Sequence, residues 1–480
     1  MESAQAQRLL FVISAMFLLV TFGRAQSNLV FYNSNDQLNA PNLNPAFLMN
    51  QEKFTLSFFP VSGISVGYNN QQVINDMLIN VLQGKLTDEQ FKEVFRSMLG
   101  IDLFYQRLEM PILSFGYNSK WGSFNFRIKD NMRLMTKLKG DVSDFLSNAS
   151  TLAIELNQVQ EFPVHAMYYR EYSIGYAKEI IRNKLSVGVR AKAYFGKFSL
   201  ISDVSGDAYR NADNEYYFRT RNQMKMSFPA NINLDEDNYF NSVTTSANFS
   251  FGSFMFNSKN VGAGFDLGIN YQINPDFSFS ASVVDVGQIK WESDLNSMDY
   301  IGEYLLDPQY INMAESDNNR LTRTPNFPAT TEQIPSLFKV VMNPAPYVTP
   351  MPVSMFAGLK YRVSQKMQIG AVDRYIQAEK MAYNTFSISG DIKINSTFRL
   401  ITGLGLQRSS LINLPLAFLK TWNVGQLFIG TDNILALATK KSDLSGISFG
   451  ATIFLFTKPS GRKMQIDYLP FFELKKKRIR

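Results

Sequence analysis

The sequence of 480 residues contains no cysteine and one histidine, His165. A chain without cysteine forms no disulfide, offers no thiolate to a metal and carries no lipidated N-terminal cysteine. With one histidine, a zinc site built from His and Cys ligands is also excluded, so only carboxylates are left as metal ligands. We therefore predict no metal site and no cofactor. The one alternative is calcium at the acidic run of residues 235–237, which is otherwise a solvated loop.

Long hydrophobic runs are also missing after residue 25, since none approaches the roughly 18 residues of a membrane-spanning helix. The first 25 residues differ from the rest. Arg8 precedes an apolar run from Leu9 to Phe22, and small residues follow as far as Ala25. This pattern is typical of a secretory signal peptide, and the run is short for a membrane anchor. We predict that residues 1–25 are a signal peptide cleaved near Ala25.

The formal net charge of +7 is moderate, and much of it lies at the end of the chain. A nucleic-acid-binding protein would cluster its basic residues within a fold, so we predict no nucleic-acid partner. The C-terminal segment, residues 458–480, is predicted to be a solvated tail. The alternative is that it binds an anionic periplasmic surface through its cations, which are Lys475, Lys476, Lys477, Arg478 and Arg480.

The hydrophobic residues, 45% of the chain, alternate with polar ones over long stretches. From Val261 to Ile273 every odd position is apolar and every even position is small or polar, which is the period of a strand with one apolar face. A turn at 274–276 leads to a second alternating strand. Each arm has the roughly 10 residues that a tilted strand needs to cross a bilayer. Asp266 and Asn270 lie on the polar face and are predicted to face a lumen.

Alternating strands continue over residues 53–457, and a strand from 184 to 198 likewise places Arg190 and Lys192 on its polar face. We predict an all-β fold, a transmembrane antiparallel β-barrel of about 14 strands (12 to 16). Helical spacing predicts inserted helices near 71–99 and 141–160. Two polar stretches, 207–246 and 293–352, are predicted to be rim loops. The alternative is a secreted β-sandwich whose apolar faces meet in a core.

Two features could indicate catalysis. Residues 446–450 match the G-x-S-x-G pattern, but a nucleophilic serine needs a sharp turn from a strand into a helix, and here the context is an alternating strand. His165 could act as a general base, although its place beside Pro163 favours a loop or rim residue. We predict no catalytic residues and no enzyme activity.

Three local patterns resemble known families. Asn44, Pro45, Ala46 and Phe47 are similar to the Asn-Pro-Ala segment of the outer-membrane fatty-acid transporters and of barrels associated with type IX secretion. The resemblance implies that residues 26–52 form a plug or hatch, with these four residues as gate candidates; the alternative is an irregular turn. GAGFDLGINYQIN, FSFSASVVDVGQIKW and GTDNIL resemble an uncharacterised Bacteroidota outer-membrane barrel family, a domain of unknown function.

The segment from Ser448 to Leu455 resembles the last-strand signal of the barrel-assembly machinery, although 24 residues follow Phe456. These resemblances imply the outer membrane of a Gram-negative cell, with its lipid and the assembly machinery as partners. The expected function is a channel or transporter for hydrophobic or amphipathic solutes. The alternative is a structural or interaction barrel that anchors a surface or secretion complex through an envelope protein partner.

Overall fold

The structure is a computed structural model, which describes residues 29–34, 37, 39–60, 62–69, 104–136, 160–210, 216–246, 249–306, 339–378, 381–407, 412–431, 433–434 and 444–455. Four predicted segments lie outside these residues. They are the signal peptide (1–25), the helical insert near 71–99, all but the last residue of the one near 141–160, and the C-terminal segment (458–480).

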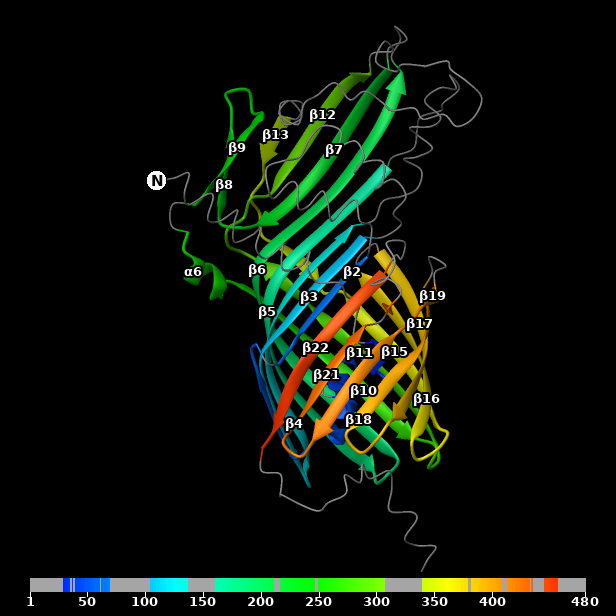
Figure 1. The fold of residues 1–480 in the computed structure, drawn as a ribbon. Helices are drawn as coiled ribbons and strands as arrows, with labels where there is room; N and C mark the ends of the chain where they lie inside the picture. The colour runs from blue at the N-terminus through cyan, green and yellow to red at the C-terminus, as the bar shows by residue number, and fades with distance from the viewer. Residues whose placement is uncertain are drawn as a thin grey trace, which may run out of the picture.

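The described strands close into an antiparallel β-barrel of 14 strands, which confirms the predicted fold class (Figure 1). The barrel closes because β1 pairs on one side with β3 and on the other with β22, so that Leu56 lies between Phe115 and Ile453. The wall consists, in order, of β1 (Phe54–Phe58) with β2 (Ile64–Asn69), β3 (Phe104–Ser119), β4 (Gly122–Thr136), β5 (Gln160–Ile181), β6 (Leu185–Arg210), β10 (Asn260–Gln272), β11 (Phe277–Trp291), β14 (Tyr347–Pro350) with β15 (Val353–Arg362), β16 (Met367–Ala378), β17 (Met381–Lys393), β18 (Phe398–Gln407), β19 (Ile412–Asn413) with β20 (Leu416–Trp422), β21 (Gly425–Thr431) and β22 (Leu444–Phe454).

Alternation along each wall strand separates an apolar outer face from a polar inner face. On β10, Leu267 and Ile269 are exposed while Asp266 and Gly268, which alternate with them, are buried. The apolar residues exposed in this way, which we call the outer belt, recur around the wall. They include Phe115, Ile174, Val189, Phe265, Leu267, Ile269, Met355, Leu359, Ile369, Phe386, Ile388, Leu404, Leu406, Phe418, Leu427, Ile429, Phe449 and Ile453.

The two rims of the barrel differ. At one rim β3–β4, β5–β6, β10–β11, β15–β16, β17–β18 and β20–β21 are joined by turns of two to four residues. Asparagine closes two of these turns, because the Oδ1 atoms of Asn274 and Asn395 each accept hydrogen bonds from backbone N–H groups two and three residues further on. The short connections bring consecutive strands together as antiparallel neighbours.

At the other rim one side of the wall continues past the barrel (Figure 1). The upper part of β6 pairs with β7 (Tyr216–Ser227), β7 with β12 (Met298–Leu306), and β12 with β13 (Lys339–Met342). A hairpin of β8 (Ala230–Leu234) and β9 (Phe240–Thr245) and the short helix α6 (Phe251–Met255) lie beside it. The prediction of rim loops is therefore wrong for the described parts of 207–246 and 293–352, most of which form strands. Strands outside the closed wall need no continuous apolar stripe, so their sequence alternation is weak.

Inside the barrel lie three short helical turns, drawn in dark blue in Figure 1. They are η1 (Leu29–Phe31), α2 (Ala40–Leu43) and η2 (Pro45–Asn50). Leu29, Leu43 and Phe47 pack against the wall residues Val284, Phe356 and Val372 in one apolar cluster. We call residues 29–50 the plug. No helix among the described residues has the length and apolar character to span a membrane.

Candidate functional site: the plug seat and the charged lumen

Asn44 joins the plug to the barrel wall. Its Nδ2 donates hydrogen bonds to the backbone oxygens of Ile269 (3.0 Å) and Ala281 (3.2 Å), which belong to the neighbouring strands β10 and β11. Its Oδ1 accepts the backbone N–H of Ala46 (2.9 Å) and so caps the start of η2. The side chain is fully buried. An amide side chain suits this position because its NH2 group donates hydrogen bonds to the wall while its oxygen accepts one from the plug backbone.

Two glycines in the wall make room for this segment. Gly188 on β6 and Gly268 on β10 are partners across the sheet. A Cβ on Gly268 would lie 2.0 Å from Oδ1 of Asn44, and one on Gly188 would lie 2.3 Å from the backbone nitrogen of Ala46. Both distances are far inside van der Waals contact, so any other residue at either position pushes the plug away from the wall.

The remaining plug contacts extend this seat over the other wall strands. Pro45, Ala46 and Phe47 are all buried, as is Asn44. Three more wall glycines leave space for plug side chains, and we call all five the glycine seat: Gly188, Gly268, Gly358 under Tyr32, Gly370 under Asn33 and Gly430 under Phe31. Polar contacts fix the register: Ser282 donates to the backbone oxygen of Leu43 (2.5 Å), and Ser34 to Oδ2 of Asp391 (2.6 Å).

Next to Gly188 on β6 and Gly268 on β10, Arg190 and Lys192 form ion pairs with Asp266. Asp266 accepts Nη1 of Arg190 at 3.0 Å and Nζ of Lys192 at 2.6 Å. Lys192 also contacts Asp285 at 2.5 Å, and Asp285 contacts Arg133 at 2.8 Å. All five side chains are buried.

The fourth lumen candidate, Asn270, is half-buried on β10 and takes no part in these ion pairs. Its Oδ1 has no hydrogen-bond partner among the described residues.

The charged side chains bind the plug as well as one another. Nη2 of Arg190 donates to the backbone oxygen of Pro41 at 2.8 Å, and Arg127 donates to Oδ1 of Asn42. Lys129 lies between Glu109 (3.2 Å) and Glu171 (3.3 Å). Removing one partner of a buried ion pair leaves a charge without compensation and costs about 3 to 5 kcal/mol. The network therefore fixes these strands and α2 relative to one another.

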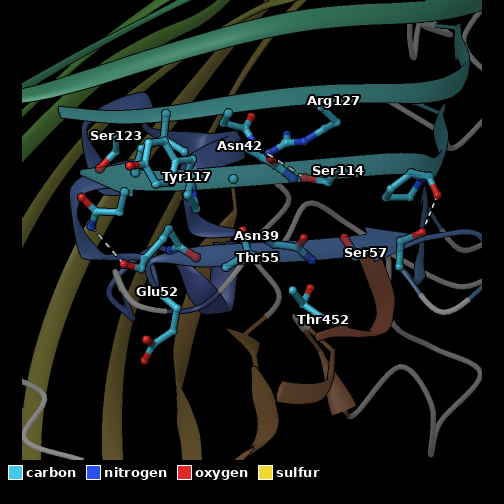
Figure 2. Close-up of a pocket in the computed structure, with 18 of the residues that line it drawn as sticks. Asn39, Asn42, Glu52, Thr55, Ser57, Ser114, Tyr117, Ser123, Arg127 and Thr452 are labelled. Atoms are coloured by element: carbon cyan, nitrogen blue, oxygen red, sulfur yellow. Dashed lines mark hydrogen bonds between the residues drawn. The ribbon is translucent and has the colours of Figure 1, made fainter. Parts of the chain in front are cut away.

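Two cavities lie beside the plug. The larger lies between the plug and the wall formed by β1, β3 and β4, and Figure 2 shows Thr55, Ser57, Ser114 and Tyr117 along it. The second is bounded by Asn42 and Leu43 of the plug and by Arg107, Glu109, Arg127, Lys129, Arg190, Lys192, Val284, Asp285, Ser354, Phe356 and Arg374. We call it the basic chamber. Arg127 lines both cavities.

The sequence features that could carry chemistry lie apart from this site. Ser448 is buried within strand β22, without the strand-to-helix turn of a nucleophile. His165 lies within β5, opposite Met135 near the end of β4, with a buried side chain, so of the predicted loop or rim positions the loop is wrong. The acidic run 235–237 is exposed at the β8–β9 turn, where Asp235 caps the backbone N–H groups of Asp237 and Tyr239. Within the described ranges, no three His, Asp or Glu side chains lie close enough to bind a metal ion.

Sequence reasoning missed Asp285, Arg133, Lys129 and Arg127 as members of the site. The signal for Asp285 was present: the alternation along β11 slips there, and Val284 and Asp285 are both buried. Asp285 has a φ of 63° at the irregularity where β10 and β11 change register, which turns its carboxylate inward. The basic residues of β3 and β4 alternate without such a break, and only the closed barrel brings them to β6 and β10.

These features define a class of protein, a closed antiparallel barrel whose lumen holds its own N-terminal segment. Residues 45–432 match the family described as "Family of unknown function (DUF5723)", and the chain belongs to this family. That range begins at Pro45 and covers nearly the whole described wall. The predicted resemblance to a barrel family of unknown function is confirmed to that extent.

Solved structures of similar fold are transporters and channels. The Ralstonia pickettii toluene transporter TbuX aligns with a TM-score of 0.35 and 10% identity over 86% of this chain and 92% of that one. The Pseudomonas putida toluene transporter TodX aligns with a TM-score of 0.34 and 10% identity over the same shares of the two chains. The TodX deltaS2S3 mutant, a monoaromatic hydrocarbon channel, aligns with a TM-score of 0.40 and 11% identity over 87% of this chain and 94% of that one. These TM-scores, all below 0.5, support no conclusion about function. No curated protein matches the sequence.

Proposed function

We propose that this chain is a channel or transporter of a bacterial outer membrane, closed by its own plug, for amphipathic solutes. The observation that carries the proposal is the seat of Asn44 to Phe47 in the glycine-lined lumen of a closed barrel. A barrel with a structural interior fills it with wall side chains, whereas here the wall is hollowed to receive a separate segment. The location follows from the outer belt, because soluble proteins rarely expose apolar patches larger than a few hundred Å².

Membrane lipid and the barrel-assembly machinery are then its partners during insertion, and residues 1–25 direct export. A Bacteroidota origin and the absence of catalysis belong to the same proposal. The amphipathic solute class rests on the larger cavity beside the plug, where hydroxyl and amide groups such as Thr55 and Asn118 alternate with apolar Leu48 and Phe428.

Removing the plug tests the proposal in planar lipid bilayers. Deleting residues 26–51 leaves every wall strand intact and is expected to raise the single-channel conductance to a steady open level. Asn44→Ala removes two hydrogen bonds to the wall. At about 1 kcal/mol each, their loss is expected to raise the open fraction roughly thirtyfold.

Asn395→Ala is the matched control, because it removes an asparagine from a rim turn that does not touch the plug. Its recordings are expected to match those of the unmodified chain. If the deletion variant folds, shown by heat-modifiable migration, and stays closed, the channel proposal is wrong.

That outcome would favour the second candidate function, an interaction barrel that anchors a surface or secretion complex. One observation favours it. β5 and β6 have 22 and 26 residues, more than twice the roughly 10 that cross a bilayer, and β7, β12 and β13 extend them outside the barrel. Such a projecting sheet offers a surface outside the barrel to an envelope protein.

A further inference from the structure

Arg127 is a buried cation whose charge is compensated by no ion pair of its own. Its side chain is 5% exposed, on a strand that faces the lumen. Its hydrogen bond goes to the neutral Oδ1 of Asn42, in the plug, as the dashed line in Figure 2 shows. Among the described residues no carboxylate lies within ion-pairing distance of it, in contrast to Lys129, Arg190 and Lys192, which all have one.

The surroundings of Arg127 contain charges of both signs, with the cations in excess. Arg190 is close enough to repel it, while Glu171, Glu109 and Asp266 attract it, although each of these carboxylates is already paired with another cation. Arg190 also lines the basic chamber, and its Nε has no hydrogen-bond partner among the described residues. Six cationic side chains line the chamber against the two carboxylates of Glu109 and Asp285. A buried charge without a counter-charge is costly, and a bound anion would remove that cost.

The other side of Arg127 opens into the larger cavity. That cavity contains apolar surface from Pro41, Leu48 and Phe428 next to hydroxyl and amide groups. A ligand with a negative head at Arg127 therefore has apolar contacts within reach for a short hydrocarbon chain. A guanidinium suits carboxylate and phosphate because its N–H groups pair with two oxygens at once.

We propose that Arg127 is the recognition residue of a binding site for the anionic head group, carboxylate or phosphate, of an amphipathic solute. The head group lies between Arg127 and Arg190 and replaces Asn42 as the partner of Arg127. This inference rests on the proposed function, since it names the class of solute that the barrel takes, but the binding site is measurable without transport.

Calorimetric titration of the full mature chain in a neutral detergent tests the site with four probes. Octanoate is expected to bind, and octanol at least tenfold more weakly, because a hydrogen bond to a charged group contributes about 1.5 to 3 kcal/mol, or about ten- to a hundredfold in affinity. Acetate and inorganic phosphate carry a charged head group without a long hydrocarbon chain, so they separate the contribution of the ligand's hydrocarbon chain from that of its head group. Phosphate binding as tight as that of octanoate would overturn the amphipathic part of the proposal.

Three variants locate the site. Arg127→Gln is expected to abolish the preference for octanoate over octanol, whereas Asn42→Ala, which frees Arg127 from the plug, is expected to strengthen octanoate binding severalfold. Lys290→Gln removes an exposed cation outside both cavities and is the matched control, with unchanged affinity expected. The Asn42 variant keeps the test decisive if Arg127→Gln fails to fold.

Equal affinity for octanoate and octanol, or an Asn42→Ala variant no tighter than the unmodified chain, would overturn the site. Conductance measured on the same preparations distinguishes a failure of the proposed binding site from a failure of the proposed channel function. If the barrel conducts without its plug but does not bind octanoate, it is a channel for another solute. If it binds octanoate but does not conduct without its plug, it is a receptor barrel.

Discussion

At the scale of single residues, the lumen shows how burial changes the role of a carboxylate. Asp266 is 0% exposed and accepts hydrogen bonds from Arg190, Lys192 and the backbone N–H of Asp285 (2.8 Å). The alternation of β10 identified it as a lumen residue, but not as the partner of two cations. From the sequence alone, Asp266→Asn would be expected to fold normally, and the ion pairs reverse that expectation.

Asp266→Asn is expected to lower the free energy of unfolding by about 3 to 5 kcal/mol, because Arg190 stays buried without its ion-pair partner while Lys192 keeps only Asp285. Urea unfolding in detergent or lipid vesicles measures this change. The control is Asp276→Asn, in the exposed β10–β11 turn, for which a change within about 0.5 kcal/mol is expected. Equal stability of the two variants would show that the lumen is hydrated well enough to make the pairs unimportant.

At the scale of elements, the wall strands could be predicted because a barrel wall with an apolar outer face and a polar inner face requires strict alternation. The hairpin around Asn274 appears in the structure near its predicted bounds. β6 extends beyond the predicted 184–198, and β7 and β12 were missed, because those parts lie beyond the barrel where alternation is not enforced.

The site itself could be predicted only in part from the sequence. Asn44 to Phe47 were singled out by resemblance, while Arg190, Lys192 and Asp266 were assigned to the polar face of a strand. What joins them is the register Gly188 to Gly268, which sets the plug directly beneath the charges. Such pairings between distant strands depend on the whole barrel, and no local pattern encodes them.

At the scale of the whole molecule, the proposed location in a membrane assigns a depth to each residue of the outer belt. Leu267 is 48% exposed near the middle of β10, and Ile273, 46% exposed, lies just past its end at the short-turn rim. A cation on the outer face costs about 2 to 4 kcal/mol at the bilayer midplane and about 0 to 1 near the interface. The depth of each outer-belt residue in the bilayer therefore predicts how much its substitution by arginine lowers the free energy of unfolding.

Leu267→Arg is expected to destabilise the folded barrel in lipid vesicles by about 2 to 4 kcal/mol, and Ile273→Arg by about 1 kcal/mol or less. Unfolding titrations followed by heat-modifiable migration measure both variants under one set of conditions. If the two costs are the same, or if the mature chain stays soluble and monomeric without detergent, the outer belt does not face lipid.

The glycine seat also has a genetic consequence, because its members oppose different parts of the plug. A Cβ at Gly358 would meet the ring of Tyr32 at 2.5 Å, so the smaller Tyr32→Leu side chain relieves the clash caused by Gly358→Ala. A Cβ at Gly188 would instead meet the backbone of Pro45 and Ala46, which every amino acid shares. A selection for revertants of a plug-opening phenotype would then recover an allele-specific suppressor of Gly358→Ala within the plug, whereas Gly188→Ala would revert only at its own codon.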